Sequence, residues 1–285
     1  MALRKADIQP APNENVEECF KSQLNIIKTL KMKLFVSKEM INAILTVVKE
    51  IDKDPKPLDV ILLLLVFSTS SGKKKIVEDL FRQRIKSGFY RASLFNSLYD
   101  DYKQVVQELH PAALSISSKL LQSTERVFID FAINWFRLQF QNYEKALFKQ
   151  RRILQQIIFL MGQNEKNAKN ALTLLCQMVA KDEDKQCLEP HCNELRVLLE
   201  KVDNFDLEEM GMLYDLLHSL CANSSSISES LQDDLDILMQ KQLCAFKPVI
   251  KCKGVLNAVM AIKHLMTKDD SHNKATDLFR KYTFW

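Results

Sequence analysis

Apolar residues recur along most of this chain at intervals of three and four positions, the spacing that gathers side chains on one face of an α-helix. One early series consists of Phe20, Leu24, Ile27 and Leu30, and it predicts a helix that begins near Asn13. Similar series continue through the chain and predict roughly eleven to thirteen helices, mostly about 10–20 residues long. No stretch alternates polar and apolar residues for long enough to predict a β-strand.

Local signals mark several of the expected helix ends. Ser37 is of the type that caps the start of a helix, and an apolar series follows it. Pro55 and Pro57 then interrupt the pattern, because a residue before proline avoids the α conformation. Residues 70–72 end the next apolar helix, and Gly88 stands where a glycine would end the helix after it. These signals predict helices joined by short connections.

Residues 125–141 form the most informative stretch. Four polar residues recur at i, i+4, i+7 and i+11, namely Asp130, Asn134, Arg137 and Gln141. Nearly all the residues between them are apolar and include Trp135 and Phe136. This arrangement predicts a helix with one narrow polar stripe that is buried around most of its circumference. A helix with neighbours on both sides, as in a stacked array, has this property.

The helical pattern therefore predicts an all-α fold, a HEAT/ARM-like helical-repeat solenoid in which helix pairs form an α-α superhelix. The scarcity of glycine, 5 in 285 residues, agrees with long helices rather than tight hairpin turns. No sequence repeat of fixed period is visible, so the solenoid is inferred from the helices alone. We expect a flexible lead-in over residues 1–13, the solenoid over 14–270, and a short terminal helix or tail over 271–285.

Cysteine usage and hydropathy indicate where the protein acts. The cysteine count of 7 is odd, and the polar, proline-containing start does not resemble a secretory signal. We therefore expect reduced, mostly buried thiols in an intracellular protein. The longest apolar run, residues 60–67, is much shorter than the ~20 residues that a membrane span requires. No membrane association is expected.

Charge is distributed unevenly, although the formal net charge is only +4. Residues 181–240 hold 15 acidic and 4 basic residues, a net charge of −11, whereas residues 241–285 hold 9 basic and 3 acidic residues, a net charge of +6. Such asymmetry is typical of a protein with an anionic partner, and solvated helix faces also produce it.

A basic ridge is expected on one helix. Lys75, Arg82 and Lys86 fall at i, i+7 and i+11, opposite a face that contains Ile76 and Phe81. A ridge of this kind can follow the phosphates of DNA without reading its bases. The alternative is a solvated outer face.

The candidate motifs for catalysis and metal binding do not have the residue spacing that these functions require. Gly72 and Lys73 lack the upstream glycine and the following hydroxyl of a phosphate-binding loop. Cys187, His191 and Cys192 cluster like metal ligands, but no second ligand pair follows them. We therefore expect no metal, no cofactor and no enzymatic activity. Two alternatives stay open, a helical-repeat adaptor that binds peptides in its groove, and an all-α enzyme whose site assembles from scattered residues.

Two segments resemble a known family. Residues 77–88, VEDLFRQRIKSG, and residues 231–260, LQDDLDILMQKQLCAFKPVIKCKGVLNAVM, are similar to the central region of the Fanconi anaemia group D-two family, in the same order and at about the same separation. The second segment is the more specific of the two, because three short motifs in it match together without a gap. These motifs are QDD at residues 232–234, KQL at 241–243 and KxxG at 251–254. The likeness runs from about Lys56 to Asp270.

The resemblance implies a function that the helical pattern does not. It implies a HEAT-like solenoid that pairs with its group I paralogue, binds DNA and acts in the nucleus in the repair of interstrand crosslinks. It also implies that the Fanconi core ubiquitin ligase attaches one ubiquitin to a single lysine of a protein that is not itself an enzyme. That acceptor maps onto Lys251.

The segment around Lys251 departs from the family pattern at three positions. Pro248 and Val249 replace less rigid residues, and Asn257 stands where the family has a small glycine. Because proline interrupts a helical run, we expect Lys251 to lie in a turn or at a frayed helix start. Lys247 and Lys253 are expected to offer competing amines.

Overall fold

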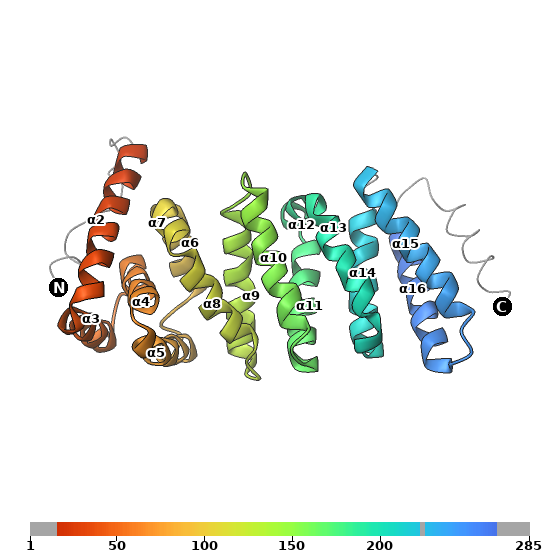
Figure 1. Ribbon diagram of the computed structural model, residues 1–285, viewed down its shortest axis with the longest axis horizontal. Helices are drawn as coiled ribbons and strands as arrows, with labels where there is room; N and C mark the ends of the chain where they lie inside the picture. Colours follow the sequence, from red (N-terminus) through yellow and green to blue (C-terminus); the bar gives the residue numbers. More distant parts are fainter. Residues whose placement is uncertain (1–15, 223–225, 267–285) are drawn as a thin grey trace. The chain divides into compact units, whose positions relative to one another are not determined.

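The structure, a computed structural model, describes residues 16–222 and 226–266, with residues 226–228 described by their backbone only. The expected lead-in over 1–13 and the expected tail over 271–285 lie outside these residues. Every regular element in the described part of the chain is helical (Figure 1). The chain divides between Asn142 and Tyr143 into two compact units.

The first unit contains helices that run from α2 to α9. Their bounds are α2 (Val16–Val36), α3 (Lys38–Glu50), α4 (Pro57–Thr69), the 3₁₀ turn η1 (Ser71–Lys73), α5 (Lys74–Lys86), α6 (Ala92–Asp101), α7 (Lys103–Glu108), α8 (His110–Leu121) and α9 (Arg126–Gln141). Most consecutive helices pack on one another, α5 and α6 instead each pack against α9, and α4 also packs against α2, α6 and α8.

The second unit contains helices that run from α10 to α16. Their bounds are α10 (Leu147–Met161), α11 (Glu165–Val179), α12 (Asp182–Leu188), η2 (Glu189–His191), α13 (Cys192–Arg196), η3 (Val197–Asn204), α14 (Leu207–Cys221), α15 (Ser226–Leu243) and α16 (Pro248–Met266). Here α14 packs against α11, α15 and α16. Within each unit, helices therefore bury their apolar faces on near neighbours in the chain, which confirms the predicted all-α helical-repeat class.

The core of the first unit forms where apolar helices are surrounded by others. All residues of α4 from Pro57 to Phe67 are buried, as expected for a helix without a polar face. Even Asp59 is buried, because its carboxylate accepts a hydrogen bond from the Lys56 backbone N–H at 2.9 Å and so caps the helix start.

The expected burial of α9 is confirmed. Trp135 and Phe136 are fully buried, whereas Asp130 and Asn134 on the polar stripe are exposed. Trp135 stacks on the Phe81 ring at 5.7 Å between ring centroids, and its indole Nε1–H donates to the Tyr99 hydroxyl at 3.1 Å. An aromatic cluster therefore joins α9 to α5 and α6, and the buried indole N–H within it has a hydrogen-bond acceptor.

The expected helix boundaries at Ser37 and Gly88 are also confirmed. The Ser37 hydroxyl accepts a hydrogen bond from the Met40 N–H at 3.2 Å, at the start of α3. Gly88 follows the end of α5 with a φ of +68°, the conformation that favours glycine. Within the described residues, no helix is both long and apolar enough to cross a membrane.

Candidate functional site

Lys251 lies in a formed helix rather than in a loop. Pro248 is the first residue of α16, a position where its missing N–H costs nothing, because the first turn has no intrahelical acceptor. The Lys251 N–H already donates to the Lys247 carbonyl at 3.1 Å, and the Lys251 side chain is exposed. The expectation of a turn or frayed start was therefore wrong, because proline at this position favours the helix.

The inner side of α16 approaches α15 closely at Gly254. A Cβ atom added at Gly254 would lie 2.9 Å from the Leu243 backbone N and 3.0 Å from the Gln242 Cβ. Gln242 is itself buried and accepts a hydrogen bond from the Tyr214 hydroxyl at 2.8 Å. Glycine at this position therefore permits the close crossing of the two helices.

Lys253 is buried, so it does not offer the competing amine that the sequence suggested. Only 7% of the residue is exposed, and its Nζ donates a hydrogen bond to the Val202 carbonyl of η3 at 2.7 Å. Lys247, in contrast, is exposed just before the helix. Of the two neighbours of Lys251 that were expected to compete, only Lys247 reaches solvent.

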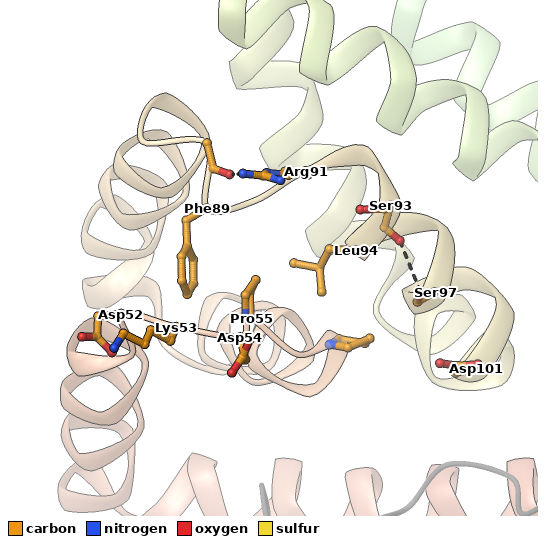
Figure 2. Close-up of a pocket in the computed structure, with 12 residues that line it drawn as sticks. Asp52, Lys53, Asp54, Pro55, Phe89, Arg91, Ser93, Leu94, Ser97 and Asp101 are labelled. Carbon is orange, nitrogen blue, oxygen red and sulfur yellow. Dashed lines mark hydrogen bonds between the residues drawn. The ribbon is translucent and has the colours of Figure 1, made fainter.

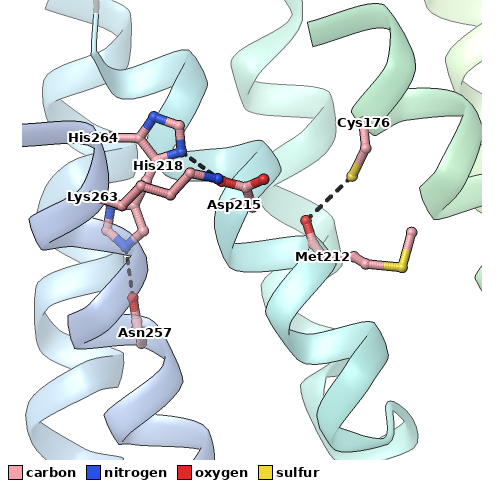
Figure 3. A network of polar contacts seen from close by, with 7 residues as sticks. All are labelled: Cys176, Met212, Asp215, His218, Asn257, Lys263 and His264. Atoms are coloured by element: carbon pink, nitrogen blue, oxygen red, sulfur yellow. Dashed lines mark hydrogen bonds and ion pairs between the residues drawn. The ribbon is translucent and has the colours of Figure 1, made fainter. Parts of the chain in front are cut away.

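Asn257 faces inward and completes a buried polar contact. Its Oδ1 lies 2.7 Å from Nε2 of His218 in α14 (Figure 3). Its Nδ2 donates a hydrogen bond to the Leu235 carbonyl of α15 at 3.1 Å. Burial lowers the pKa of His218 to about 4, so the ring is neutral at physiological pH and its Nε2–H can donate to Asn257. Asn257 of α16, which replaces the glycine expected from the family, thus forms hydrogen bonds with both α14 and α15.

The other end of α16 is joined to α14 by a charged contact. Asp215 of α14 accepts hydrogen bonds from Nζ of Lys263 at 2.6 Å and from Nε2 of His264 at 2.7 Å (Figure 3). The hydrogen bond from His264, together with Lys263, holds the pKa of Asp215 down at about 2. Sequence reasoning missed this contact, because its partners lie more than 40 positions apart in the chain.

The outer side of α16 combines Lys251 with apolar residues. Val255 and Val259 follow Lys251 at i+4 and i+8, and each is 51% exposed. Val249 is 61% exposed, and Phe246 in the preceding turn is completely exposed. The acceptor candidate therefore stands on a helix face whose other exposed side chains are largely apolar.

The basic ridge on α5 is partly engaged within the protein. Lys75 is exposed. Arg82, however, donates to the Lys119 carbonyl at 3.1 Å, and Lys86 forms an exposed ion pair of 2.7 Å with Glu125. Asp79, also exposed, lies between them on the same helix face. The three cations thus share one face, as expected from their spacing, but that face is of mixed charge.

A hollow of about 580 Å³ opens where the α3–α4 loop faces the loop before α6 and α6 itself (Figure 2). Polar residues line it, including the carboxylates of Asp52, Asp54 and Asp101 and the cations of Lys53 and Arg91. The Arg91 guanidinium donates to a carbonyl of the preceding turn at 3.0 Å. Asp54 has a positive φ of 51°, which aspartate tolerates better than most residues.

A second hollow, a groove of about 460 Å³, lies between α3 and α5. Each helix contributes residues at i, i+3, i+4 and i+7, which are Asn42, Leu45, Thr46 and Lys49 from α3, and Ile76, Asp79, Leu80 and Gln83 from α5. Ile76 is 44% exposed, whereas the sequence placed it on the buried face of α5. The groove therefore has an apolar floor and polar rims.

Neither hollow gathers metal ligands. In the part of the chain that the structure describes, no group of three or more His, Cys, Asp or Glu residues is placed to hold a metal ion. The suspected cluster at Cys187, His191 and Cys192 has another environment. Nε2 of His191 lies 3.0 Å from the Gln150 Oε1, and burial raises the pKa of the Cys192 thiol to about 11.

The helical stacks in each unit define an all-α helical-repeat protein. The family model described as Fanconi anaemia protein FancD2 nuclease matches residues 5–281 of the chain. The chain belongs to this family.

Individual relatives agree with this assignment. The chain is 23% identical over 257 residues to the Fanconi anemia group D2 protein homolog of Mus musculus, which covers 90% of this chain and 17% of the mouse protein. It is 22% identical to the Fanconi anemia group D2 protein of Gallus gallus, over 85% of this chain and 17% of that protein. The homolog of Drosophila melanogaster is 22% identical over 86% of this chain and 17% of its own length. The chain thus spans about a sixth of these relatives.

Proposed function

We propose that this chain is a scaffold segment of the Fanconi anaemia machinery that repairs DNA interstrand crosslinks in the nucleus. In this role it pairs with the group I paralogue, binds DNA and accepts one ubiquitin on Lys251 from the Fanconi core ubiquitin ligase. The chain itself catalyses no reaction. The matching family model carries the word nuclease in its description, but we propose no catalytic residue in this chain.

One observation carries the proposal. The family match covers residues 5–281 and so includes the acceptor segment, and within that segment Lys251 is an exposed lysine on the first turn of a helix. Ubiquitin transfer requires an amine that reaches the loaded thioester and can lose its proton. An exposed amine on a formed helix meets the first requirement, and a buried amine such as that of Lys253 does not.

The proposed contact with DNA rests on less specific features. Lys75, Arg82 and Lys86 lie on one face of α5, where Lys75 is exposed and Lys86 is held only by an exposed ion pair. Exposed ion pairs are weak, so a phosphate could replace Glu125 as the partner of Lys86 at little cost. The Arg82 guanidinium donates a hydrogen bond to the Lys119 backbone carbonyl, and its carbon lies 5.0 Å from the centroid of the Phe128 ring. Its charge lies on the same helix face as Lys75 and Lys86 and would add to their attraction for phosphates.

The decisive variant is Lys251→Arg, which keeps the positive charge and removes the primary amine. In a reconstituted reaction with the core ligase, ubiquitin, the group I paralogue and duplex DNA, the wild-type chain should gain one ubiquitin and the variant none. Lys247→Arg is the matched control, because Lys247 is an exposed lysine one turn away, and it should be modified at the wild-type rate. Conjugation to Lys251→Arg at the wild-type rate would show that the acceptor lies elsewhere.

A second candidate function is that of a peptide-binding adaptor. The groove between α3 and α5 favours it, because two helices present apolar residues flanked by Asn42, Thr46 and Gln83, an arrangement suited to an amphipathic helix. A chain that served only in this way would take no ubiquitin in the reaction above.

A further inference from the structure

The first two turns of α16 carry two lysines in opposite surroundings. Lys251 is exposed, whereas only 7% of Lys253 is exposed and its Nζ donates to the Val202 carbonyl at 2.7 Å. Lysine is almost never fully buried without a partner, because its charge must keep hydrogen bonds that water would otherwise provide. The helix therefore presents one of two neighbouring amines to solvent and uses the other internally.

The bond from Lys253 acts where a helix has the least support of its own. The first backbone N–H groups of any helix lack intrahelical acceptors. Lys253 joins this end of α16 to η3, 51 residues earlier in the chain. On the next residue, Gly254 lets the helix lie directly against α15. Together, these two contacts fix how α16 is rotated about its axis, and that rotation directs Lys251 outwards.

We propose that Lys253 is a positioning residue that selects Lys251 as the acceptor, an inference that rests on the proposed acceptor function. In the transfer, the neutral amine of Lys251 attacks the thioester carbonyl of the ubiquitin-loaded carrier enzyme. The new C–N isopeptide bond forms, the C–S bond breaks, the carrier thiolate leaves, and the proton lost by the amine nitrogen passes to that thiolate, directly or through water. The rate depends on how well the attacking amine is oriented. Lys253 contributes by holding the turn that carries Lys251 and by keeping its own amine out of reach.

The sequestration of Lys253 can be tested without any ligase. The folded full chain is treated briefly with an amine-acetylating reagent, and acetylation of each lysine is followed by mass spectrometry of a digest. Lys251 and Lys247 should react readily, and Lys253 should react at least about tenfold more slowly, because its amine is buried and hydrogen-bonded. Equal reaction of Lys253 and Lys251 would overturn the inference.

The positioning role is tested by Lys253→Met, which keeps an unbranched side chain but removes the donor. Replacing a buried charged group with an apolar one of similar size is often neutral or stabilising, so thermal unfolding should change little. The rate of conjugation to Lys251 should nevertheless fall by about tenfold, because misorientation of a reacting group is costly. Lys253→Arg, which can still donate to the Val202 carbonyl, should restore much of the rate. Lys247→Met is the control and should leave the rate unchanged.

These outcomes separate a merely structural lysine from a positioning one. Lys253→Met modified at the wild-type rate would overturn the inference, as would transfer of ubiquitin to Lys253 in Lys251→Arg. Failure of the proposed function gives a different result. In that case the wild-type chain takes no ubiquitin on Lys251, although Lys253 is still protected from acetylation.

Discussion

Buried polar residues connect α14 to α16, and each of them is matched to a partner. His218 is buried and bonded to Asn257, which in turn donates to a carbonyl of α15. A neutral imidazole fits this environment, because burial would deprive a charged imidazolium of its hydration. His218 should therefore make the stability of the second unit sensitive to acid.

The sign of this pH dependence follows from the direction of the pKa shift. The pKa of His218 is about 4 in the folded protein and about 6.5 in an unfolded chain, so the unfolded state binds the proton first as pH falls. Stability is full above the unfolded pKa and decreases as pH drops from about 6.5 to about 4. Between about pH 7 and about pH 5, His218 should reduce the free energy of unfolding by roughly 2 kcal/mol.

Urea unfolding of the wild type and of His218→Gln at both pH values measures this contribution. The variant lacks the titrating group but keeps a hydrogen-bond donor, so its loss of stability on acidification should be smaller by about the same amount. Equal losses in the two proteins would mean that His218 is not held neutral by burial.

At the scale of elements, the α15–α16 hairpin depends on one glycine. The Cβ that Gly254→Ala would add meets the Leu243 backbone, which cannot move as a flexible side-chain end could. Such overpacking typically costs about 1–3 kcal/mol, and separation of the two helices should also slow modification of Lys251.

Gly211→Ala provides a matched control, because Gly211 is also helical but has no atoms within 4 Å of the added Cβ. There alanine should stabilise the protein by up to about 1 kcal/mol, through helix propensity alone. Chemical denaturation of both variants compares the two effects. A Gly254→Ala protein as stable as the Gly211→Ala protein would contradict the close crossing.

Much of the element pattern could be predicted from the sequence because its signals are local. The polar stripe on α9, the cap at Ser37 and the glycine at position 88 each reflect residues within a few positions of one another. Burial of Trp135 followed from the same periodicity. The helical class and the ends of several helices were therefore accessible before the structure.

The surroundings of individual charged residues could not be predicted in the same way. Lys253 is typical of an exposed lysine by sequence, and its burial depends on a carbonyl 51 residues away. Arg82 fits a DNA-binding ridge by spacing, but Lys119 of α8 provides its hydrogen-bond acceptor. Pro248 suggested an interrupted segment, whereas it begins α16. In each case, the tertiary neighbour or the position within the helix decided the outcome.

At the scale of the whole molecule, the chain covers about 17% of the length of its vertebrate relatives. The proposed pairing with the group I paralogue, DNA binding and ubiquitin acceptance would each depend on an assembly rather than on this chain alone. If the chain acts as a scaffold, the partner and the duplex should speed the modification of the exposed amine of Lys251.

The most direct measurement is intact-mass spectrometry of the wild-type chain after reaction with the core ligase and ubiquitin, with peptide mapping of the product. The reaction is run with and without the group I paralogue and duplex DNA. The account predicts the mass increase of a single ubiquitin, located on Lys251, and a faster reaction when partner and duplex are both present. An unmodified chain under all conditions, or ubiquitin spread over exposed lysines such as Lys247, would contradict it.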